Sequence, residues 1–299
     1  MKFYMKYTGL WVGGLCLLCA CSSPQKAPID YVDPFIGTGF HGHTYPGATA
    51  PFGAVQLSPD TRRGNWDASS GYHYSDSTIL GFSHTHLSGT GCQDLGDVLL
   101  RPTTQPVRTE GEGDIFLPAA FSHDSEKARP GYYAVELADE QIKVELTATT
   151  FAGLNDKDAS VIVDVTHILN TDDFIYEAEV KQTADNELVG MRRTRSWVDN
   201  QYIYFVLQFS KPIQELQQIN EKQAVARFGQ ERELIAKVGL SIVSVENARE
   251  NLLHDMPDFN FDAVCQQAKS AWEEELSIVS VKGGTEAQRT NFYTAWYHS

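Results

Sequence analysis

Apolar and polar side chains alternate with a period of two through much of the stretch from residue 132 to residue 245. The clearest case is residues 201–210, where Ile203, Phe205, Leu207 and Phe209 fall on one face of an extended chain. A period of two with many β-branched and aromatic residues is typical of β-strands. The same texture recurs, with no helical segment between, at residues 132–139, 141–150, 160–168, 174–182, 187–197, 223–228 and 233–245. This succession of short strands predicts a mainly β fold, an antiparallel β-sandwich.

The period changes after residue 245. Residues 246–253 fit one or two helical turns, and from Asp262 apolar residues recur at spacings of three and four as far as Leu276, which predicts an amphipathic helix. Thr285 and Gln288 form a capping box for another helix, whose apolar face would contain Phe292, Ala295 and Trp296. Because that face has no evident cover, we expect a helical domain to follow. Without it, residues 246–299 should be poorly held, and proteases should cut first after residue 245.

The charge balance excludes one class of partner. The 299 residues include 39 Asp and Glu against 24 Lys and Arg, a net charge of −15. An anionic surface of this size argues against nucleic acid as a partner, whereas it is compatible with neutral ligands such as sugars.

The N-terminus predicts export. Lys2 and Lys6 precede an apolar run at residues 9–18 that is too short to span a membrane. The sequence Leu-Cys-Ala-Cys at residues 18–21 resembles the lipobox of bacterial lipoproteins, in which cleavage leaves Cys21 as the lipidated first residue. The alternative is an ordinary signal peptide cleaved near Ala20. We expect a protein anchored by lipid to the bacterial outer membrane, facing the periplasm or the cell surface, with residues 22–30 as a tether.

Few cysteines remain for disulfides. Cys16 and Cys19 leave with the export signal, and Cys21 would carry lipid, so only Cys92 and Cys265 remain in the mature chain. Two cysteines do not make a disulfide scaffold in a chain of this length, although a single bridge between them stays open.

Residues 64–97 concentrate the chain's polar chemistry. They contain one Trp, three His, four Asp, one Cys and six Gly, with few large aliphatic residues. Polar groups this dense must be solvated or hydrogen-bonded to one another, because burying them unpaired is costly. The segment therefore predicts glycine-hinged loops that present an aromatic ring, imidazoles and carboxylates at a surface.

Trp66 is the strongest single candidate for a ligand contact. An indole in a glycine-rich loop can stack on the apolar face of a pyranose ring, although it can also anchor the loop. Asp67, Asp94 and Asp97 could accept hydrogen bonds from sugar hydroxyls, but Asp is equally common in turns and caps. Asp97 is the weakest of the three because a strand is expected to begin there.

Histidine and cysteine add further candidates. His84 and His86 could hydrogen-bond a sugar or hold the loops, and Cys92 could line a pocket or be a buried thiol. Ser83 beside His84 also suggests a serine nucleophile, but the Gly-x-Ser-x-Gly elbow of serine hydrolases is absent from the sequence.

A metalloenzyme is a competing hypothesis. His41 and His43 form one His-x-His pair, and His84 and His86 form another. If both pairs converged with Asp94, they would make a transition-metal site. His-x-His alone is a weak signal, and we do not assign a metal ligand from it.

Several blocks spread over the chain match one family. They are YVDPFIGTG at 31–39, YPGA at 45–48, PFG at 51–53, SGYHY at 70–74, GFSHTHLSGTG at 81–91, Asp94 with Gly96 and Asp97, KVGLS at 237–241 and FYTA at 292–295. In these blocks the sequence resembles glycoside hydrolase family 92, the calcium-dependent, exo-acting α-mannosidases.

The resemblance implies a division of the chain. Residues 31–245 would form a β-sandwich of the galactose-mutarotase-like supersandwich type, residues 246–284 a helical linker, and residues 285–299 the start of an (α/α)6 catalytic barrel. The substrate would lie between sandwich and barrel. The catalytic acid, the general base and the calcium ligands would belong mostly to the barrel, where an inverting mechanism needs two separated carboxylates. We therefore expect no catalytic residue and no metal ligand within this chain.

The resemblance also implies a function. The chain would be the N-terminal, substrate-contacting part of an exo-acting α-mannosidase that cleaves mannose-containing glycans, either N-glycans or mannans. Its contacts would come from Trp66, Asp67, His84, His86, Cys92 and Asp94. The alternative is a stand-alone carbohydrate-binding lipoprotein without hydrolase activity.

Overall fold

A computed structural model describes residues 26–107 and 117–299. The predicted export signal and Cys21, the predicted lipidation site, lie outside these residues. Within the described part, the strands are β1 (Ala48–Thr49), β2 (Gln56–Asp60), β3 (Thr78–Ile79), β4 (Gly81–Ser83), β5 (Leu99–Thr103), β6 (Ala119–Ala120), β7 (Lys127–Arg129), β8 (Tyr132–Leu137), β9 (Ile142–Leu146), β10 (Thr149–Asp164), β11 (Phe174–Ala184), β12 (Glu187–Arg195), β13 (Gln201–Phe209), β14 (Glu215–Asn220) and β15 (Gln223–Ser241). The helices are α1 (Val245–Asp255), α2 (Phe261–Leu276) and α3 (Glu286–His298), and the 3-10 turns are η1 (Pro28–Tyr31), η2 (Trp66–Ala68) and η3 (His123–Ser125).

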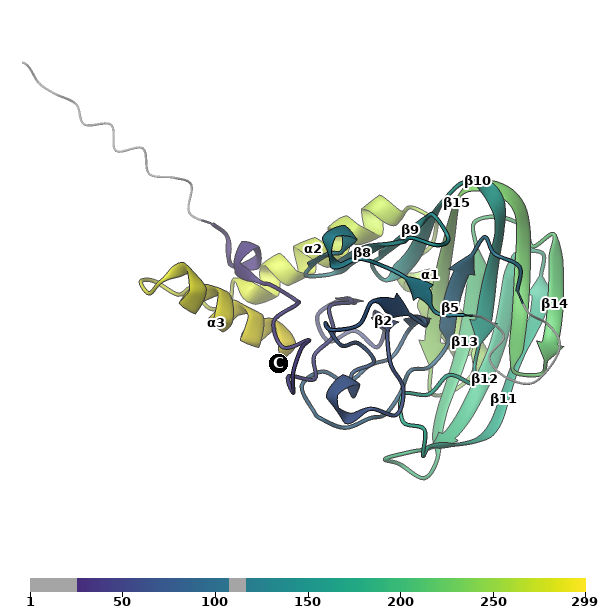
Figure 1. Cartoon of the computed structure of the whole chain (residues 1–299), viewed down its shortest axis with the longest axis horizontal. Helices are drawn as coiled ribbons and strands as arrows, with labels where there is room; N and C mark the ends of the chain where they lie inside the picture. Colours follow the sequence, from purple (N-terminus) through teal and green to yellow (C-terminus); the bar gives the residue numbers. More distant parts are fainter. Residues whose placement is uncertain (1–25, 108–116) are drawn as a thin grey trace, which may run out of the picture.

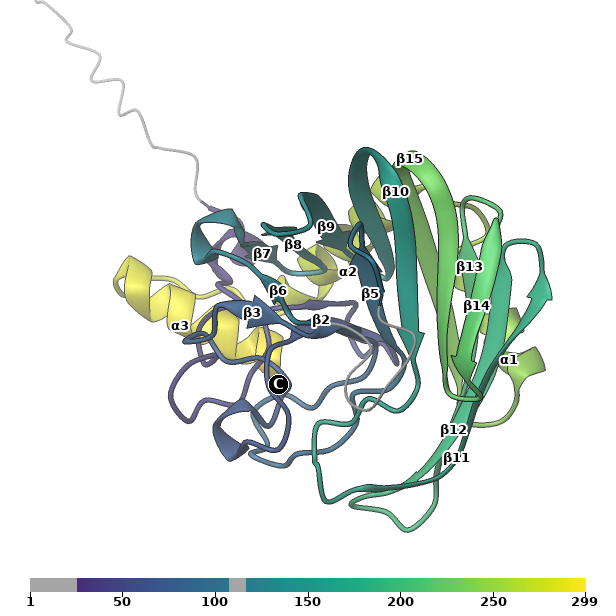
Figure 2. The same cartoon turned by 45° about the vertical axis from the view of Figure 1, so that its right-hand side comes forward.

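Antiparallel strands dominate the molecule, as the alternation predicts. Among the described residues, one large sheet follows the order β1-β2-β4-β5-β10-β15-β13-β12-β11, with β14 paired to β15 and the strands β7, β8 and β9 branching from β10. Figures 1 and 2 show this sheet bent, so that the shorter N-terminal strands face the long strands β10 to β15. The predicted sandwich is thus confirmed. None of the helices in the described ranges is long and apolar enough to cross a membrane.

The longest strand joins two segments that the sequence separates. Residues 223–228 and 233–245 are predicted as different strands, yet β15 runs without a break from Gln223 to Ser241. Its pairing with β10 shifts by one residue between Ala159 and Ser160, where Gly229 lies opposite with a φ of 73°. Glycine adopts this left-handed conformation at no steric cost, so a β-bulge carries the strand through a polar stretch. The prediction also misses β14, an edge strand with a mostly polar sequence.

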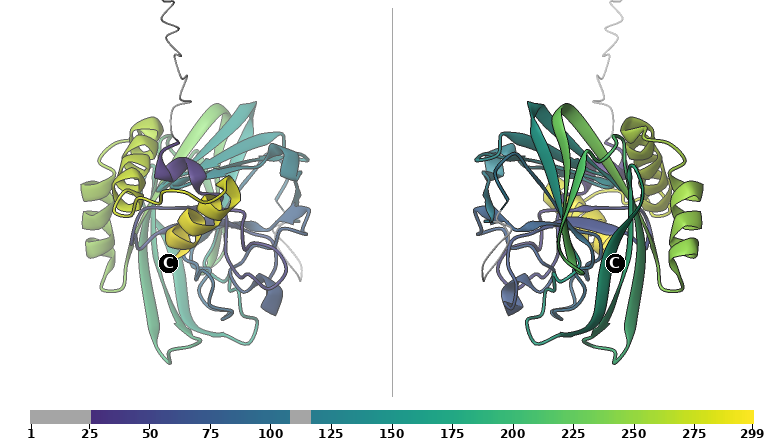
Figure 3. Two further views of the ribbon diagram at one scale, coloured as in Figure 1. Left: turned by 90° about the vertical axis from the view of Figure 1, so that its left-hand side faces the viewer. Right: turned by 90° about the vertical axis from the view of Figure 1, so that its right-hand side faces the viewer.

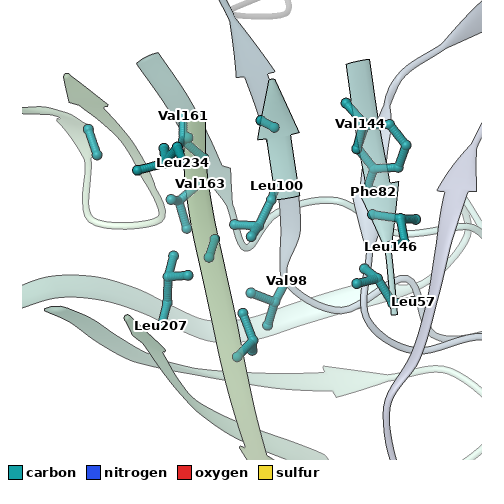
Figure 4. Packing of buried hydrophobic residues seen from close by; sticks show 14 of the residues in the cluster. Leu57, Phe82, Val98, Leu100, Val144, Leu146, Val161, Val163, Leu207 and Leu234 are labelled. Carbon is teal, nitrogen blue, oxygen red and sulfur yellow. The ribbon is translucent and has the colours of Figure 1, made fainter. Parts of the chain in front are cut away.

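The core lies between the two halves of the bent sheet. Residues from strands distant in sequence meet there, including Leu57, Phe82, Leu100, Val144 and Leu207 (Figure 4). All of these side chains are at most 1% exposed. Burial on this scale drives the folding of the sandwich, since a fully buried aliphatic or Phe side chain contributes roughly 1.5–3 kcal/mol.

Helix α1 covers the outer face of the sheet. Ala248, Leu252 and Met256 pack there against Val189 and Val206. Val206 lies on the face of β13 opposite to Phe205 and Leu207. Because α1 covers that face, Val206 is fully buried. Figure 3 shows the helices along the outside of the sandwich. The helix expected at 246–253 is longer than predicted, and it packs on the sheet.

Helices α2 and α3 close the side of the sandwich near the N-terminus. Trp272 is buried and its Nε1 donates to the carbonyl of Thr49 at 2.6 Å. Trp272 also packs against Tyr297 of α3, with 4.5 Å between ring centroids. These contacts join α2 to strand β1 and to α3.

The buried face of α3 differs from the predicted one. Its N-terminal capping box at Thr285 is confirmed. Its buried residues, however, are Tyr293, Thr294 and Tyr297, while Phe292 and Trp296 are 38% and 36% exposed. The reason is that α3 packs on η1, where Tyr293 stacks on Tyr31 at 5.7 Å and the Thr294 hydroxyl accepts from the Asp33 amide.

Candidate functional site

Trp66 stands at the surface on the short turn η2. Asn65 caps this turn, because its side chain accepts a hydrogen bond from the backbone N–H of Asp67. The indole is 55% exposed, and its Nε1 donates to the carbonyl of Gly91 at 3.0 Å. Trp66 is therefore held in place at one edge of its ring while much of the ring stays open to a ligand.

Two imidazoles and a carboxylate surround this indole. The ring of His43 meets Trp66 edge-on, with 4.3 Å between centroids, and the ring of His41 lies 5.1 Å away. His41 Nδ1 is 2.6 Å from a carboxylate oxygen of Asp67. We refer to Trp66, His41, His43 and Asp67 as the Trp66 cluster.

His43 is the most unusual member of the Trp66 cluster. It is 7% exposed, and its Nε2 has no hydrogen-bond partner among the described residues. Burial, together with the neighbouring His41, lowers the pKa of His43, so that the ring is kept neutral. The unsatisfied Nε2 is itself buried, so His43 supports the indole from beneath, while the exposed His41 and Asp67 are the polar groups of the cluster that a ligand can reach.

The metal hypothesis built on both histidine pairs is wrong in its geometry. Within the described ranges, the one group of three or more ligating side chains close enough to share an ion is His41, His43 and Asp67, with ligand atoms within 4.8 Å of one another. His84, His86 and Asp94 are not part of it. Two imidazoles and one carboxylate also do not fit calcium, which prefers six to eight oxygen ligands.

His84 and His86 are interior residues, contrary to the expected surface loops. His84 is 2% exposed, and its Nδ1 lies 2.7 Å from the carbonyl of Val98. Burial lowers the pKa of His84 to about 4, although the bond to Val98 opposes this shift in part. His84 is thus a neutral ring that joins neighbouring chain segments, with no surface left for a sugar.

His86 belongs to a buried network centred on Asp60. Its Nδ1 lies 2.6 Å from the carbonyl of Gln56, and its Nε2 lies 2.8 Å from Asp60 Oδ1. The second oxygen of Asp60 lies 2.8 Å from His167 Nε2. Burial alone would raise the pKa of Asp60, but His86 and His167 outweigh it and hold this pKa well below its usual range. Both nitrogens of His86 therefore face oxygen atoms of the interior, at Gln56 and at Asp60.

Ser83, His86 and Asp60 have the residue types of a catalytic triad but not its geometry. Ser83 Oγ and Asp60 Oδ1 both contact the same nitrogen, His86 Nε2, at 3.1 and 2.8 Å. In a working triad the serine and the aspartate contact opposite nitrogens of the ring. Ser83 and Asp60 are also fully buried. The group is structural, in agreement with the missing nucleophile elbow.

Asp97 and Asp94, two further predicted residues, are both buried. Asp97 is fully buried, pairs with Arg192 at 2.8 Å and accepts from the Thr85 hydroxyl at 2.6 Å. Asp94 is 7% exposed, and one of its oxygens accepts from the Leu95 amide at 2.7 Å.

Cys92 is the residue after Gly91, whose carbonyl accepts from the Trp66 indole. It is partly buried and lines a small cavity. Burial, with Asp94 and Asp173 nearby, raises the pKa of its thiol. Cys92 and Cys265 are both free in the structure.

A second concave surface involves the C-terminal helix. A cavity of about 460 Å³ is lined by Tyr45, Phe52, His86, Trp272, Trp296 and His298, among others. Burial lowers the pKa of His298 to about 4. Sequence reasoning missed this cavity, because it forms only when α3 packs beside residues 49–56.

A β-sandwich that presents a half-exposed indole among hydrogen-bonding side chains is typical of proteins that act on carbohydrates. The comparisons with known families agree. The Glycosyl hydrolase family 92 N-terminal domain matches residues 31–242, and the Glycosyl hydrolase family 92 catalytic domain matches residues 247–299. The chain belongs to glycosyl hydrolase family 92.

Similar proteins carry related descriptions. An uncharacterized secreted glycosidase of Arthroderma benhamiae is 28% identical, covering 99% of this chain and 44% of its own length. A family GH92 α-mannosidase from Bacteroides thetaiotaomicron, solved in complex with mannoimidazole, is 31% identical with a TM-score of 0.83, over 91% of this chain and 40% of its own. A further GH92 family glycosyl hydrolase superposes with a TM-score of 0.76 at 26% identity. The chain thus spans less than half the length of these relatives.

Proposed function

We propose that this chain is the N-terminal, substrate-contacting part of an exo-acting α-mannosidase that cleaves mannose-containing glycans, such as N-glycans or mannans. The observation that carries the proposal is the Trp66 cluster. Its indole offers a flat apolar face for a pyranose ring, while the exposed Asp67 and His41 offer an acceptor and a donor for the hydroxyls at the ring edge. Family membership and the neighbour solved with mannoimidazole support the sugar class.

The hydrolytic chemistry is proposed to come from the family's catalytic domain. Residues 247–299 match the beginning of that domain. Inverting hydrolysis needs an acid and a base about 6.5–9.5 Å apart on opposite faces of the sugar. We assign neither role to a residue of this chain, and we propose that the calcium of the family enzymes is likewise held by the catalytic domain. The role of the present residues is to bind and orient the sugar. The alternative of a stand-alone binding lipoprotein is less favoured, because residues 247–299 match the family's catalytic domain.

A binding titration tests the proposal. Purified protein is titrated with methyl α-mannoside, and affinity is followed by tryptophan fluorescence and calorimetry. We expect weak binding, and Trp66→Ala should reduce the affinity at least about tenfold, a change of 1.4 kcal/mol. The matched control is Trp296→Ala, which removes another partly exposed indole, one that lines the cavity beside α3, and should leave the affinity unchanged. Binding that depends on Trp296 and not on Trp66 would move the sugar site to the α3 cavity.

Export and lipid anchoring through Cys21 remain part of the proposal. They rest on the lipobox and on the secreted relative. Cells fed a labelled fatty acid should incorporate the label into this protein. Cys21→Ser should abolish incorporation, whereas Cys19→Ser should not. Equal labelling of both variants would count against the anchor.

A further inference from the structure

A small cavity lies beside the Trp66 cluster and has no part in the proposal so far. It has a volume of about 310 Å³ and is lined by Cys92, Asn170, Asp173, Arg195 and Trp197, among others. This volume is at the lower end of the range for small-molecule sites, which is about 300–1,000 Å³. Three chain segments form its wall: the loop before β5, the loop between β10 and β11, and the end of β12 with the turn that follows it.

The side chains around this cavity suit a sugar. Trp197 is 74% exposed, so its indole contributes little to the core and presents a flat apolar face. Asn170 Nδ2 donates to Asp173 Oδ1 at 2.9 Å, and the carboxylate of Asp173 lines the cavity as a hydrogen-bond acceptor. Burial raises the pKa of Asp173, with Asp94 adding to this effect against the bonds from Ser196 and Asn170. An aromatic platform beside an acceptor is the combination that a pyranose needs.

Arg195 completes the set as a donor. In the part of the chain that the structure describes, its guanidinium makes no side-chain hydrogen bond and no ion pair. Guanidinium groups present five N–H donors in a fixed fork, so Arg195 can reach two neighbouring hydroxyls at once. Donor, acceptor and aromatic face therefore border one small space.

Two chain segments connect the cavity with the Trp66 cluster. Trp66 donates to the carbonyl of Gly91, and the next residue, Cys92, lines the cavity. On the other side, the Gly64 amide donates to the carbonyl of Leu169 at 2.8 Å, and the next residue, Asn170, lines the cavity. Figure 2 shows these loops at the end of the molecule where the lower ends of β11 and β12 also lie. Two linked sugar residues could therefore occupy the two places together.

We propose that the cavity at Cys92, Asp173, Arg195 and Trp197 is a second sugar subsite, which binds a neighbouring residue of a mannose-containing oligosaccharide. This inference rests on the proposed function of the Trp66 cluster as the first subsite. Its consequence is that the protein prefers oligosaccharides to single sugars.

The test compares two sugars on the same protein. Methyl α-mannoside and an α-linked mannotriose are titrated by calorimetry into the wild-type chain and into the Trp66→Ala and Trp197→Ala variants. We expect the trisaccharide to bind about tenfold more tightly than the monosaccharide, a gain within the range of one aromatic contact. Trp197→Ala should abolish this gain and leave the monosaccharide affinity unchanged. Asp173→Asn and Arg195→Ala should each remove part of the gain, and Trp296→Ala is the control for loss of an indole elsewhere.

Each outcome decides between the two proposals. Equal affinity for both sugars, or a gain that survives Trp197→Ala, overturns the second subsite while the Trp66 site stands. Trisaccharide binding that depends on Trp197 but not on Trp66 keeps the subsite and overturns the role given to Trp66. Failure of both sugars to bind the wild-type chain overturns both proposals.

Discussion

The two His-x-His pairs of this chain have the same local sequence pattern and opposite surroundings. His84 and His86 are buried. His84 Nδ1 contacts the carbonyl of Val98, and the two nitrogens of His86 contact the carbonyl of Gln56 and the carboxylate of Asp60. His41 and His43 lie beside the exposed Trp66, where one buried nitrogen has no partner within the described residues. The difference teaches that exposure and the hydrogen-bond partners of the ring nitrogens, not the residue type, separate a structural histidine from one that can contact a ligand.

The largest expected effect comes from removing Asp60, the carboxylate that His86 and His167 share. Asp60→Ala leaves His86 and His167 buried without their shared carboxylate. Breaking a buried charged pair typically costs about 3–5 kcal/mol, so we expect a loss of that order in the free energy of unfolding. Urea unfolding followed by circular dichroism measures it, and Asp60→Asn should lose less because it keeps one acceptor. A loss below about 1 kcal/mol would show that the network is not the structural centre.

Acid should destabilise the protein through His84. Its pKa is 6.5 when unfolded and about 4 when folded, so the unfolded state binds more protons between these values. Stability from this group is therefore present above pH 6.5 and is lost as pH falls towards 4, by up to about 3 kcal/mol. Unfolding curves at several pH values test this window.

Replacing His84 isolates its contribution to the pH dependence. His84→Gln can still donate to Val98 but cannot titrate, so its stability should depend less on pH between 4 and 6.5. His298→Gln should reduce the same pH slope independently, because burial also lowers the pKa of His298 to about 4, and the double variant should show both reductions. An unchanged pH slope in His84→Gln would show that this ring titrates normally in the fold.

An intermediate effect is expected at Gly91, which supports the Trp66 cluster. Gly91 has a φ of 62°, and a Cβ there would lie 2.9 Å from His43 Nδ1. Gly91→Ala should cost about 1–2 kcal/mol from the left-handed backbone and should also displace His43. Gly89→Ala is a matched control, with a φ of 71° and no atom within 4 Å of its Cβ. Both should lose stability, but only Gly91→Ala should change Trp66 fluorescence and sugar affinity.

The smallest effect on stability is expected at Asp67. Its ion pair with His41 is exposed, and such pairs contribute about 0–1 kcal/mol. Asp67→Ala should therefore leave the unfolding midpoint nearly unchanged while it weakens binding of methyl α-mannoside. Asp60→Ala and Asp67→Ala each remove a carboxylate that contacts histidine, but only Asp60→Ala should lower the free energy of unfolding strongly. A large stability loss in Asp67→Ala would place this cluster with the structural network instead.

Much of the fold was readable from local pattern. The alternation at residues 201–210 determined that Phe205 and Leu207 face the core, because a strand has no other way to bury every second side chain. The capping box at Thr285 likewise determined where α3 begins, because its two hydrogen bonds are made within four residues. Local sequence could not show that β15 is continuous, since the bulge at Gly229 depends on its pairing with β10.

The candidate site was readable only in part. The sequence by itself determined that Trp66 and Asp67 lie on a glycine-rich loop, because such a loop has no apolar face to bury. Only the tertiary structure decided that His86 is bound to Asp60 and that Trp197 faces the cavity beside Cys92. The physical reason is distance along the chain: these contacts join residues 26 to 105 positions apart, and only the packing of the sheet brings them together.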